Sequence, residues 1–120
     1  MNSKKELGSW GEQKAAAYLR RRGYKILEMN YLCRQGEIDI IAEKGKYIVF
    51  AEVKLRKDKS FAEAREFVTW SKQQRILLTA QKYLMEQETQ LQPRFDVIEI
   101  YAPEGRDGKI KIEHIMDAFE

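Results

Sequence analysis

The sequence predicts an α/β protein with a mixed sheet and the element order α-β-β-β-α-β-β. Segments 3–22 and 71–87 carry apolar residues at the three-to-four-residue spacing of a helix. Five shorter segments have the β-rich or alternating composition of strands: 24–31, 36–42, 47–56, 95–101 and 109–115. Because a helix joins the third and fourth strands, we expect these two strands to be parallel neighbours. Whether the layers number two or three stays open.

Composition limits the classes of protein to which the chain can belong. We expect its 120 residues, 1–120, to form one domain, and 43% hydrophobic with 34% charged residues is the balance of an ordinary globular protein. The net charge of +3 is compatible with nucleic acid as a partner. A single cysteine excludes an internal disulfide framework and fits a reducing compartment. No apolar leader or membrane-spanning run is visible, so we expect a cytoplasmic protein with no membrane partner.

The first helix brings one acidic residue to the edge of its apolar face. Ser3 and Glu6 fit a capping box, and Gly23 is a natural residue to follow the helix end. Glu12 lies seven residues before Leu19, hence close to the buried stripe, where it is either a site residue or a boundary glutamate in solvent. The basic run 20–22 either contacts phosphate or simply complements the helix dipole, and from the sequence we prefer the second interpretation.

The hairpin of segments 36–56 carries charge where a covered strand should be apolar. If Gly45 and Lys46 form a two-residue turn, Asp39 lies opposite Glu52 on one face, with Cβ atoms roughly 5 Å apart. Lys54 then follows on the same face as Glu52. A three-residue turn would instead place the two carboxylates on opposite faces. The interpretation of the site depends on this register.

The second helix points polar residues along its packing face. A second capping-box pattern begins at Ser71, and the predicted packing face consists of Ile76, Ala80, Tyr83 and Leu84. Lys72 and Gln73 in the first turn fall within this arc, although solvated residues at a helix start are an equal alternative.

The two residues most typical of zinc sites and of nucleophilic catalysis occur once each. We expect His114 to be a strand residue and Cys33 to be a small, partly buried thiol. With no second histidine or cysteine, a zinc site of thiolates or imidazoles is excluded.

An acidic pair followed by a lysine suits a hard divalent cation. Asp39 and Glu52, with the Val53 carbonyl, supply oxygen ligands of the kind that Mg²⁺ or Mn²⁺ takes. Lys54 can orient or deprotonate a water, or stabilise charge on a phosphate, and the reaction class is phosphodiester hydrolysis. The alternative is that each carboxylate only pairs with one of the many lysines and arginines.

Blocks of sequence along nearly the whole chain match one pattern, among them Gly11-Glu12, Gly23-Tyr24, Gly36-Glu37-Ile38-Asp39-Ile40-Ile41-Ala42, Glu52-Val53-Lys54-Leu55-Arg56 and Arg94-Phe95-Asp96-Val97-Ile98. With them the chain resembles the bacterial YraN-like family, which is similar in fold to Holliday-junction resolvases and other PD-(D/E)xK nucleases. The resemblance implies a restriction-endonuclease-like mixed sheet flanked by helices. It makes Asp39, Glu52 and Lys54 the matching triad, although Ile38 stands where the motif has proline.

The same resemblance implies roles for further residues and for partners. Glu12 becomes the helical acidic position, and Lys72 or Gln73 the polar helix position. DNA, branched or damaged, is the implied substrate, and a homodimer is the implied assembly. Arg56, Lys57 and Arg75 are the weaker candidates for contact with nucleic acid. A nucleic-acid-binding protein without turnover and a protein-interaction module are the alternative functions.

Overall fold

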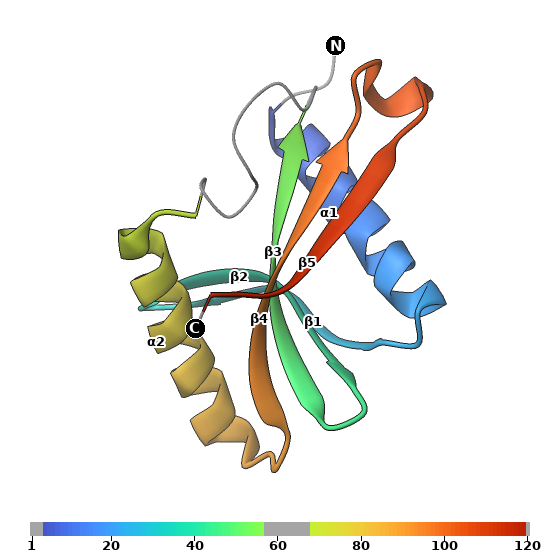
Figure 1. Cartoon of the computed structure of the whole chain (residues 1–120). Helices are drawn as coiled ribbons and strands as arrows, with labels where there is room; N and C mark the ends of the chain where they lie inside the picture. The colour runs from blue at the N-terminus through green and yellow to red at the C-terminus, as the bar shows by residue number, and fades with distance from the viewer. Residues whose placement is uncertain (1–3, 57–67, 120) are drawn as a thin grey trace.

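The computed structural model describes residues 4–56 and 68–119. Its elements follow the predicted order, with a short 3₁₀ helix before the last strand (Figure 1). They are α1 (Lys4–Arg21), β1 (Lys25–Cys33), β2 (Gly36–Lys44), β3 (Tyr47–Arg56), α2 (Trp70–Gln87), β4 (Gln92–Tyr101), η2 (Gly105–Asp107) and β5 (Lys111–Phe119).

The five strands form one mixed sheet in the order β1-β2-β3-β4-β5. Only β3 and β4 are parallel, as expected for strands joined through a helix, and the other neighbours are antiparallel. The predicted α/β mixed sheet is confirmed, and it has the architecture expected of a restriction-endonuclease-like core.

The two helices cover opposite faces of the sheet, so the molecule has three layers (Figure 1). On the α1 side, Ala15, Ala16 and Leu19 pack in one buried cluster with Val49 and Ala51 of β3. On the α2 side, a second cluster joins α2 to the alternate residues of β3 and its neighbours; it includes Ile76, Ala80, Tyr83, Ile48 and Phe50. Burial of both faces explains why β3 begins as a nearly continuous apolar run.

The β2–β3 turn has the predicted two-residue form. Lys44 pairs with Tyr47 across it, and Gly45 has φ +59° while Lys46 does not have a positive φ. A positive φ at the first central residue alone is the signature of a type II′ turn. The predicted register is therefore confirmed as far as the backbone ladder extends.

That ladder ends early, and its end opens the sheet. The last β2–β3 pair is Ile40 with Ala51. Beyond this pair, the start of β2 pairs only with β1, and the end of β3 pairs only with β4. The two central strands thus separate at Asp39 and Glu52.

The helix ends differ in part from the prediction. Gly23, with φ +89°, follows α1 as expected, and the amide of Tyr24 donates to the carbonyl of Leu19. The helix α2 begins earlier than predicted, because Thr69 and not Ser71 is its N-cap and accepts a hydrogen bond from the amide of Lys72. The capping box at Ser3 lies outside the described residues.

A buried polar cluster ties β5 and α1 to β4. Asp96 is fully buried. Its carboxylate forms an ion pair with the guanidinium of Arg94, and Nε2 of His114 lies 2.6 Å from its Oδ2. The other imidazole nitrogen, Nδ1, lies 3.3 Å from the hydroxyl of Tyr18 on α1. Burial alone would raise the pKa of Asp96, but the hydrogen bonds from His114 and Arg94 hold it below its usual value. His114 is therefore a strand residue that joins two layers, as expected.

The described part of the chain contains no helix that is both long and apolar enough to cross a membrane.

Candidate functional site

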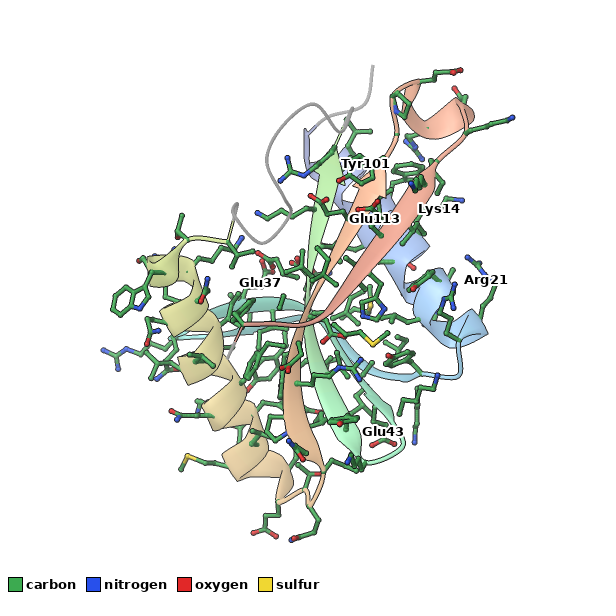
Figure 2. The ribbon with its side chains drawn as sticks, viewed as in Figure 1. Lys14, Arg21, Glu37, Glu43, Tyr101 and Glu113 are labelled. Atoms are coloured by element: carbon green, nitrogen blue, oxygen red, sulfur yellow. The ribbon has the colours of Figure 1, made fainter. Side chains whose placement is uncertain are left out.

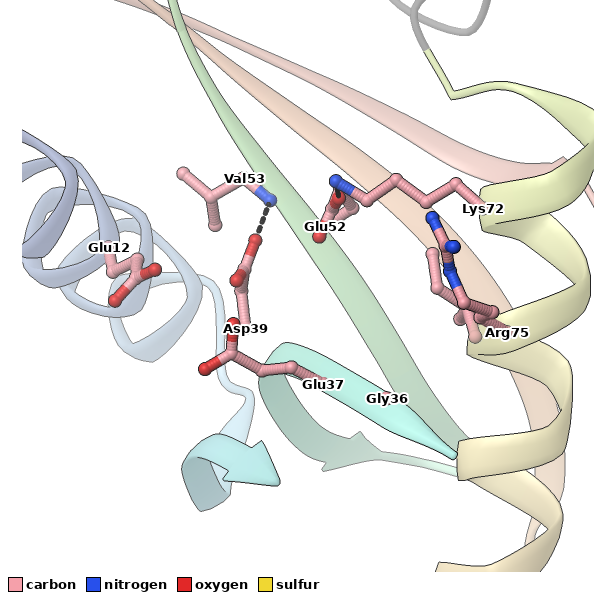
Figure 3. Close-up of a pocket in the computed structure, with 9 residues that line it drawn as sticks. Glu12, Gly36, Glu37, Asp39, Glu52, Val53, Lys72 and Arg75 are labelled. Carbon is pink, nitrogen blue, oxygen red and sulfur yellow. Dashed lines mark hydrogen bonds and ion pairs between the residues drawn. The ribbon is translucent and has the colours of Figure 1, made fainter. Parts of the chain in front are cut away.

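A cleft of about 310 Å³ opens where β2 and β3 separate (Figure 3). The strands form its floor, α1 contributes one side and α2 the other. Its lining consists of Glu12, Gly36, Glu37, Asp39, Glu52, Val53, Lys72, Arg75 and Ile76. Residues far apart in sequence, including both predicted acidic strand positions, thus converge on one hollow.

Beyond the last β2–β3 pair, the side chain of Asp39 replaces the β2 backbone as a hydrogen-bond partner of β3. Its Oδ2 accepts a hydrogen bond from the amide of Val53 at 2.8 Å, directly beyond the last ladder pair (Figure 3). Burial, followed by the hydrogen bond and charge of Glu52, raises the pKa of Asp39 to about 9. The two carboxyl groups are therefore neighbours that resist carrying two negative charges, as the register predicted.

Glu52 is the most enclosed charge in the cleft. Its side chain is only 5% exposed, and the buried Oε2 accepts no hydrogen bond of normal geometry. The ammonium group of Lys72 forms an ion pair with this oxygen. Burial would lower the pKa of Lys72, but its hydrogen bond to Glu52 and their attraction raise it above the usual value. A cationic group is thus held against the innermost carboxylate.

Lys54 lies on the same face as Glu52, two residues along β3, and the sequence placed it correctly. It is half-buried and does not belong to the cleft lining itself. Burial, together with the nearby charge of Lys72, lowers the pKa of Lys54. This is the direction that makes a lysine amine available as a proton acceptor.

The remaining predicted positions divide into those that reach the cleft and those that do not. Glu12 and Arg75 line it, from α1 and α2 respectively. Gln73 instead donates its side-chain amide to the carbonyl of Val68 at 2.9 Å. Arg56 forms an ion pair with buried Glu99. Lys57 lies outside the described residues.

Glu37 and Gly36 also line the cleft, although they are not among the site residues predicted from the sequence. Alternation along β2 places Glu37 on the same face as Asp39, so the register was sufficient to find it. Gly36 has φ +154°, and a Cβ there would meet the hydroxyl oxygen of Thr79 at 3.1 Å. A side chain at this position would therefore crowd Thr79 of α2 and strain the backbone.

The oxygen donors of the cleft suit a hard cation. Within residues 4–56 and 68–119 no group of three or more His, Cys, Asp or Glu side chains converges. Two carboxylates do converge, and the buried oxygen of Glu52 already has a cationic partner in the ammonium of Lys72. In a strand, the amide and carbonyl of one residue face the same edge, so the Val53 carbonyl faces the β2 edge as its amide does. These oxygens fit Mg²⁺ or Mn²⁺, which are often held by one or two carboxylates.

Comparison with known proteins assigns the family. The model of the uncharacterised protein family UPF0102 matches residues 11–100. A UPF0102 protein of Caldanaerobacter subterraneus subsp. tengcongensis is 47% identical, over 98% of this chain and 97% of its own length. UPF0102 proteins of Syntrophomonas wolfei and Syntrophotalea carbinolica are each 45% identical, over 96% and 95% of this chain and 98% and 91% of their own. The predicted YraN-like resemblance is confirmed, and the chain belongs to the family UPF0102.

Proposed function

We propose that this protein is a divalent-metal-dependent endonuclease that hydrolyses phosphodiester bonds in DNA. One observation carries the proposal. Asp39 and Glu52 come together at the point where the central strands separate, with Lys72 held against Glu52 in the same cleft. Two adjacent carboxyl groups, buried Glu52 and half-buried Asp39, destabilise a fold unless a cation compensates them, and their oxygens fit such a cation.

The acidic residues would hold the metal. Asp39, Glu52 and the carbonyl of Val53 are the oxygens that face this position. A bound Mg²⁺ or Mn²⁺ supplies an activated water and neutralises charge that develops on the phosphate. Asp39 already has its orientation fixed by the Val53 amide, so little reorganisation is needed. Glu12 lines the opposite side of the cleft and adds negative charge near Asp39.

The basic residues would act on the substrate. Lys72 and Arg75 project from α2 into the cleft, where their charges favour a phosphate group (Figure 3). Lys54 has a lowered pKa next to Lys72, which suits a group that takes a proton from the attacking water. The acidic groups of Asp39 and Glu52 therefore lie on the strand floor of the cleft, and the basic groups of Lys72 and Arg75 lie on its α2 wall.

Cleavage assays test the proposal directly. The purified protein is incubated with linear, circular and four-way-junction DNA in Mg²⁺, in Mn²⁺ and in EDTA. We expect metal-dependent cutting that falls by at least about 10²-fold in Asp39→Asn and Glu52→Gln. Glu43→Gln is the matched control, because Glu43 is an acidic residue of the same strand as Asp39 but lies at its far end, beside the β2–β3 turn. Absence of cutting on every DNA, or equal cutting by all variants, would overturn the proposal.

One observation favours a second candidate, a DNA-binding protein without turnover. The ammonium of Lys72 already compensates the charge of Glu52, so the cleft has a cation of its own. This candidate predicts salt-sensitive DNA binding in EDTA with no metal-dependent product.

A further inference from the structure

A second concentration of positive charge lies away from the cleft, where the end of α1 meets the β2–β3 turn. We define it as the basic end surface, made of Arg20, Arg21, Arg22, Lys44 and Lys46. All five side chains are exposed, and Figure 2 labels Arg21 at this end of α1. Along β3, the turn and the cleft are separated by the five steps from Tyr47 to Glu52, about 17 Å at strand spacing.

Contacts hold three of the five cations, Arg22, Lys44 and Lys46, at the junction of the helix end and the turn, and Arg20 and Arg21 precede Arg22 in the last turn of α1. The ammonium of Lys44 donates to the carbonyl of Arg22 at 2.6 Å, which ties the turn to the helix end. Three tyrosine rings support the cations. The Arg22 guanidinium lies 4.8 Å from the centre of the Tyr18 ring, and the ammonium groups of Lys44 and Lys46 lie 5.1 Å and 5.4 Å from the rings of Tyr24 and Tyr47. The rings therefore hold the charges in place.

The charge of this surface is not compensated. None of the five cations forms an ion pair in the part of the chain that the structure describes. Glu28 of β1 and Glu43 of β2 lie on the α2 side of the sheet, away from this surface. There, burial and the charges of these two residues raise the pKa of Tyr83. Asp96, under the rings, is already paired with Arg94 and His114.

Complementing the helix dipole explains only part of the arrangement. Arg20 and Arg21 lie in the last turn of α1, where positive charge is favourable. Lys44 and Lys46 belong to a different element, and bringing them to the same place adds repulsion that the dipole does not offset. Binding of an extended anion relieves the repulsion among cations that are arranged in this way.

We propose that the basic end surface binds the phosphodiester backbone of a nucleic acid, as a contact separate from the cleft. Cations already cover one face of each supporting ring, so the surface offers charge to phosphates more than stacking to bases. An anionic membrane is the less suitable partner. The large exposed apolar side chains of the described residues are Leu32, Leu55, Trp70, Leu78, Met85 and Met116, and none of them belongs to this surface. The contact does not depend on whether the cleft cuts.

Binding measurements with matched charge variants test the proposal. Fluorescence anisotropy of a labelled duplex is followed in EDTA between about 50 and 200 mM NaCl. The triple variant Arg20→Gln, Arg21→Gln, Lys46→Gln is compared with Lys25→Gln, Lys82→Gln, Lys109→Gln. Both remove three exposed positive charges, but Lys25 pairs with Glu43 in the β1–β2 ladder and so lies on the opposite face of the sheet.

We expect the first variant to bind DNA about 10- to 100-fold more weakly, with the logarithmic salt slope reduced by about 2 to 3. The second variant should stay close to the unaltered protein. Thermal unfolding of each variant checks that these exposed substitutions leave the fold intact, and the single variant Arg21→Gln should lower the slope by about 1.

Three results would overturn the proposal: no DNA binding by the unaltered protein, equal loss in both triple variants, or unchanged binding in the first. Vesicles of phosphatidylcholine containing one quarter phosphatidylglycerol form a parallel arm. Vesicle binding that the first variant loses while its DNA binding persists would assign the surface to a membrane instead. Asp39→Asn, which should lower cutting by at least about 10²-fold, should retain this DNA binding, so failure of the cleft and failure of the surface are distinguishable.

Discussion

Replacing Asp39 by asparagine should stabilise the protein, because its half-buried carboxyl beside Glu52 is unfavourable without a cation. The amide can keep the hydrogen bond from Val53 and donate to Glu52. The pKa of Asp39 is raised from 3.8 to about 9. Between these two values the unfolded chain ionises while the folded protein keeps the proton. The folded state therefore loses stability as the pH rises, by at most about 1.4 kcal/mol per pH unit.

The magnitude follows from that slope. From about pH 5 to pH 7 the stability gap between Asp39→Asn and the unaltered protein should widen by up to about 2.8 kcal/mol. Since Asp39 and Glu52 share the unfavourable charge, we expect a widening of about 1–2 kcal/mol. Below about pH 3, where the carboxyl is largely protonated in both states, the pH-dependent part of the gap should vanish.

Urea unfolding in EDTA, followed by tryptophan fluorescence between about pH 4 and pH 8, measures the gap. Glu43→Gln, on the same strand but outside the cleft, is the control and should show no comparable widening. A gap that stays constant with pH, or an asparagine variant that is less stable at pH 7, would refute the account of the acidic pair.

Three further predictions concern residues around the site. Thr69→Ala should cost about 1 kcal/mol of unfolding free energy through loss of the α2 cap, whereas Thr69→Ser should restore most of it; equal stability of all three proteins would contradict the cap. Lys72→Met leaves Glu52 buried without its cation and should cost about 1–3 kcal/mol in EDTA, with part of the loss recovered in Mn²⁺; no destabilisation would contradict the ion pair. Asp96 has a pKa below its usual value, so its contribution to stability is complete above about pH 4 and is lost as the pH falls through the folded pKa. Acid titration of unfolding should show a smaller loss in Asp96→Asn than in the unaltered protein, and identical acid limbs would contradict this.

Local signals were sufficient for the fold and for the floor of the site. The Gly45 turn fixes the β2–β3 register, and that register alone places Asp39 beside Glu52. The helical spacing of Ile76, Ala80 and Tyr83 identifies the buried face of α2, and the same arc directs Lys72 toward the strands.

What the sequence could not supply was the end of the β2–β3 ladder. No local pattern shows that pairing stops after Ile40, because the residues on both strands continue the composition of a strand beyond this pair. Gln73 shows the same limit. The sequence predicts its position in the helical arc, but its side-chain amide donates a hydrogen bond to the nearby carbonyl of Val68. The start of α2 was misassigned because Ser71 and Thr69 both offer a cap, and only the backbone before Trp70 decides between them.

The central claim is that Asp39 and Glu52 share a divalent cation. Crystals soaked in MnCl₂ and measured near the manganese absorption edge test it most directly. We predict one anomalous peak at about 2.0–2.3 Å from a carboxylate oxygen of each residue, with Lys72 moved away from Glu52. A cleft with no manganese, in which Lys72 still pairs with Glu52, would contradict the claim.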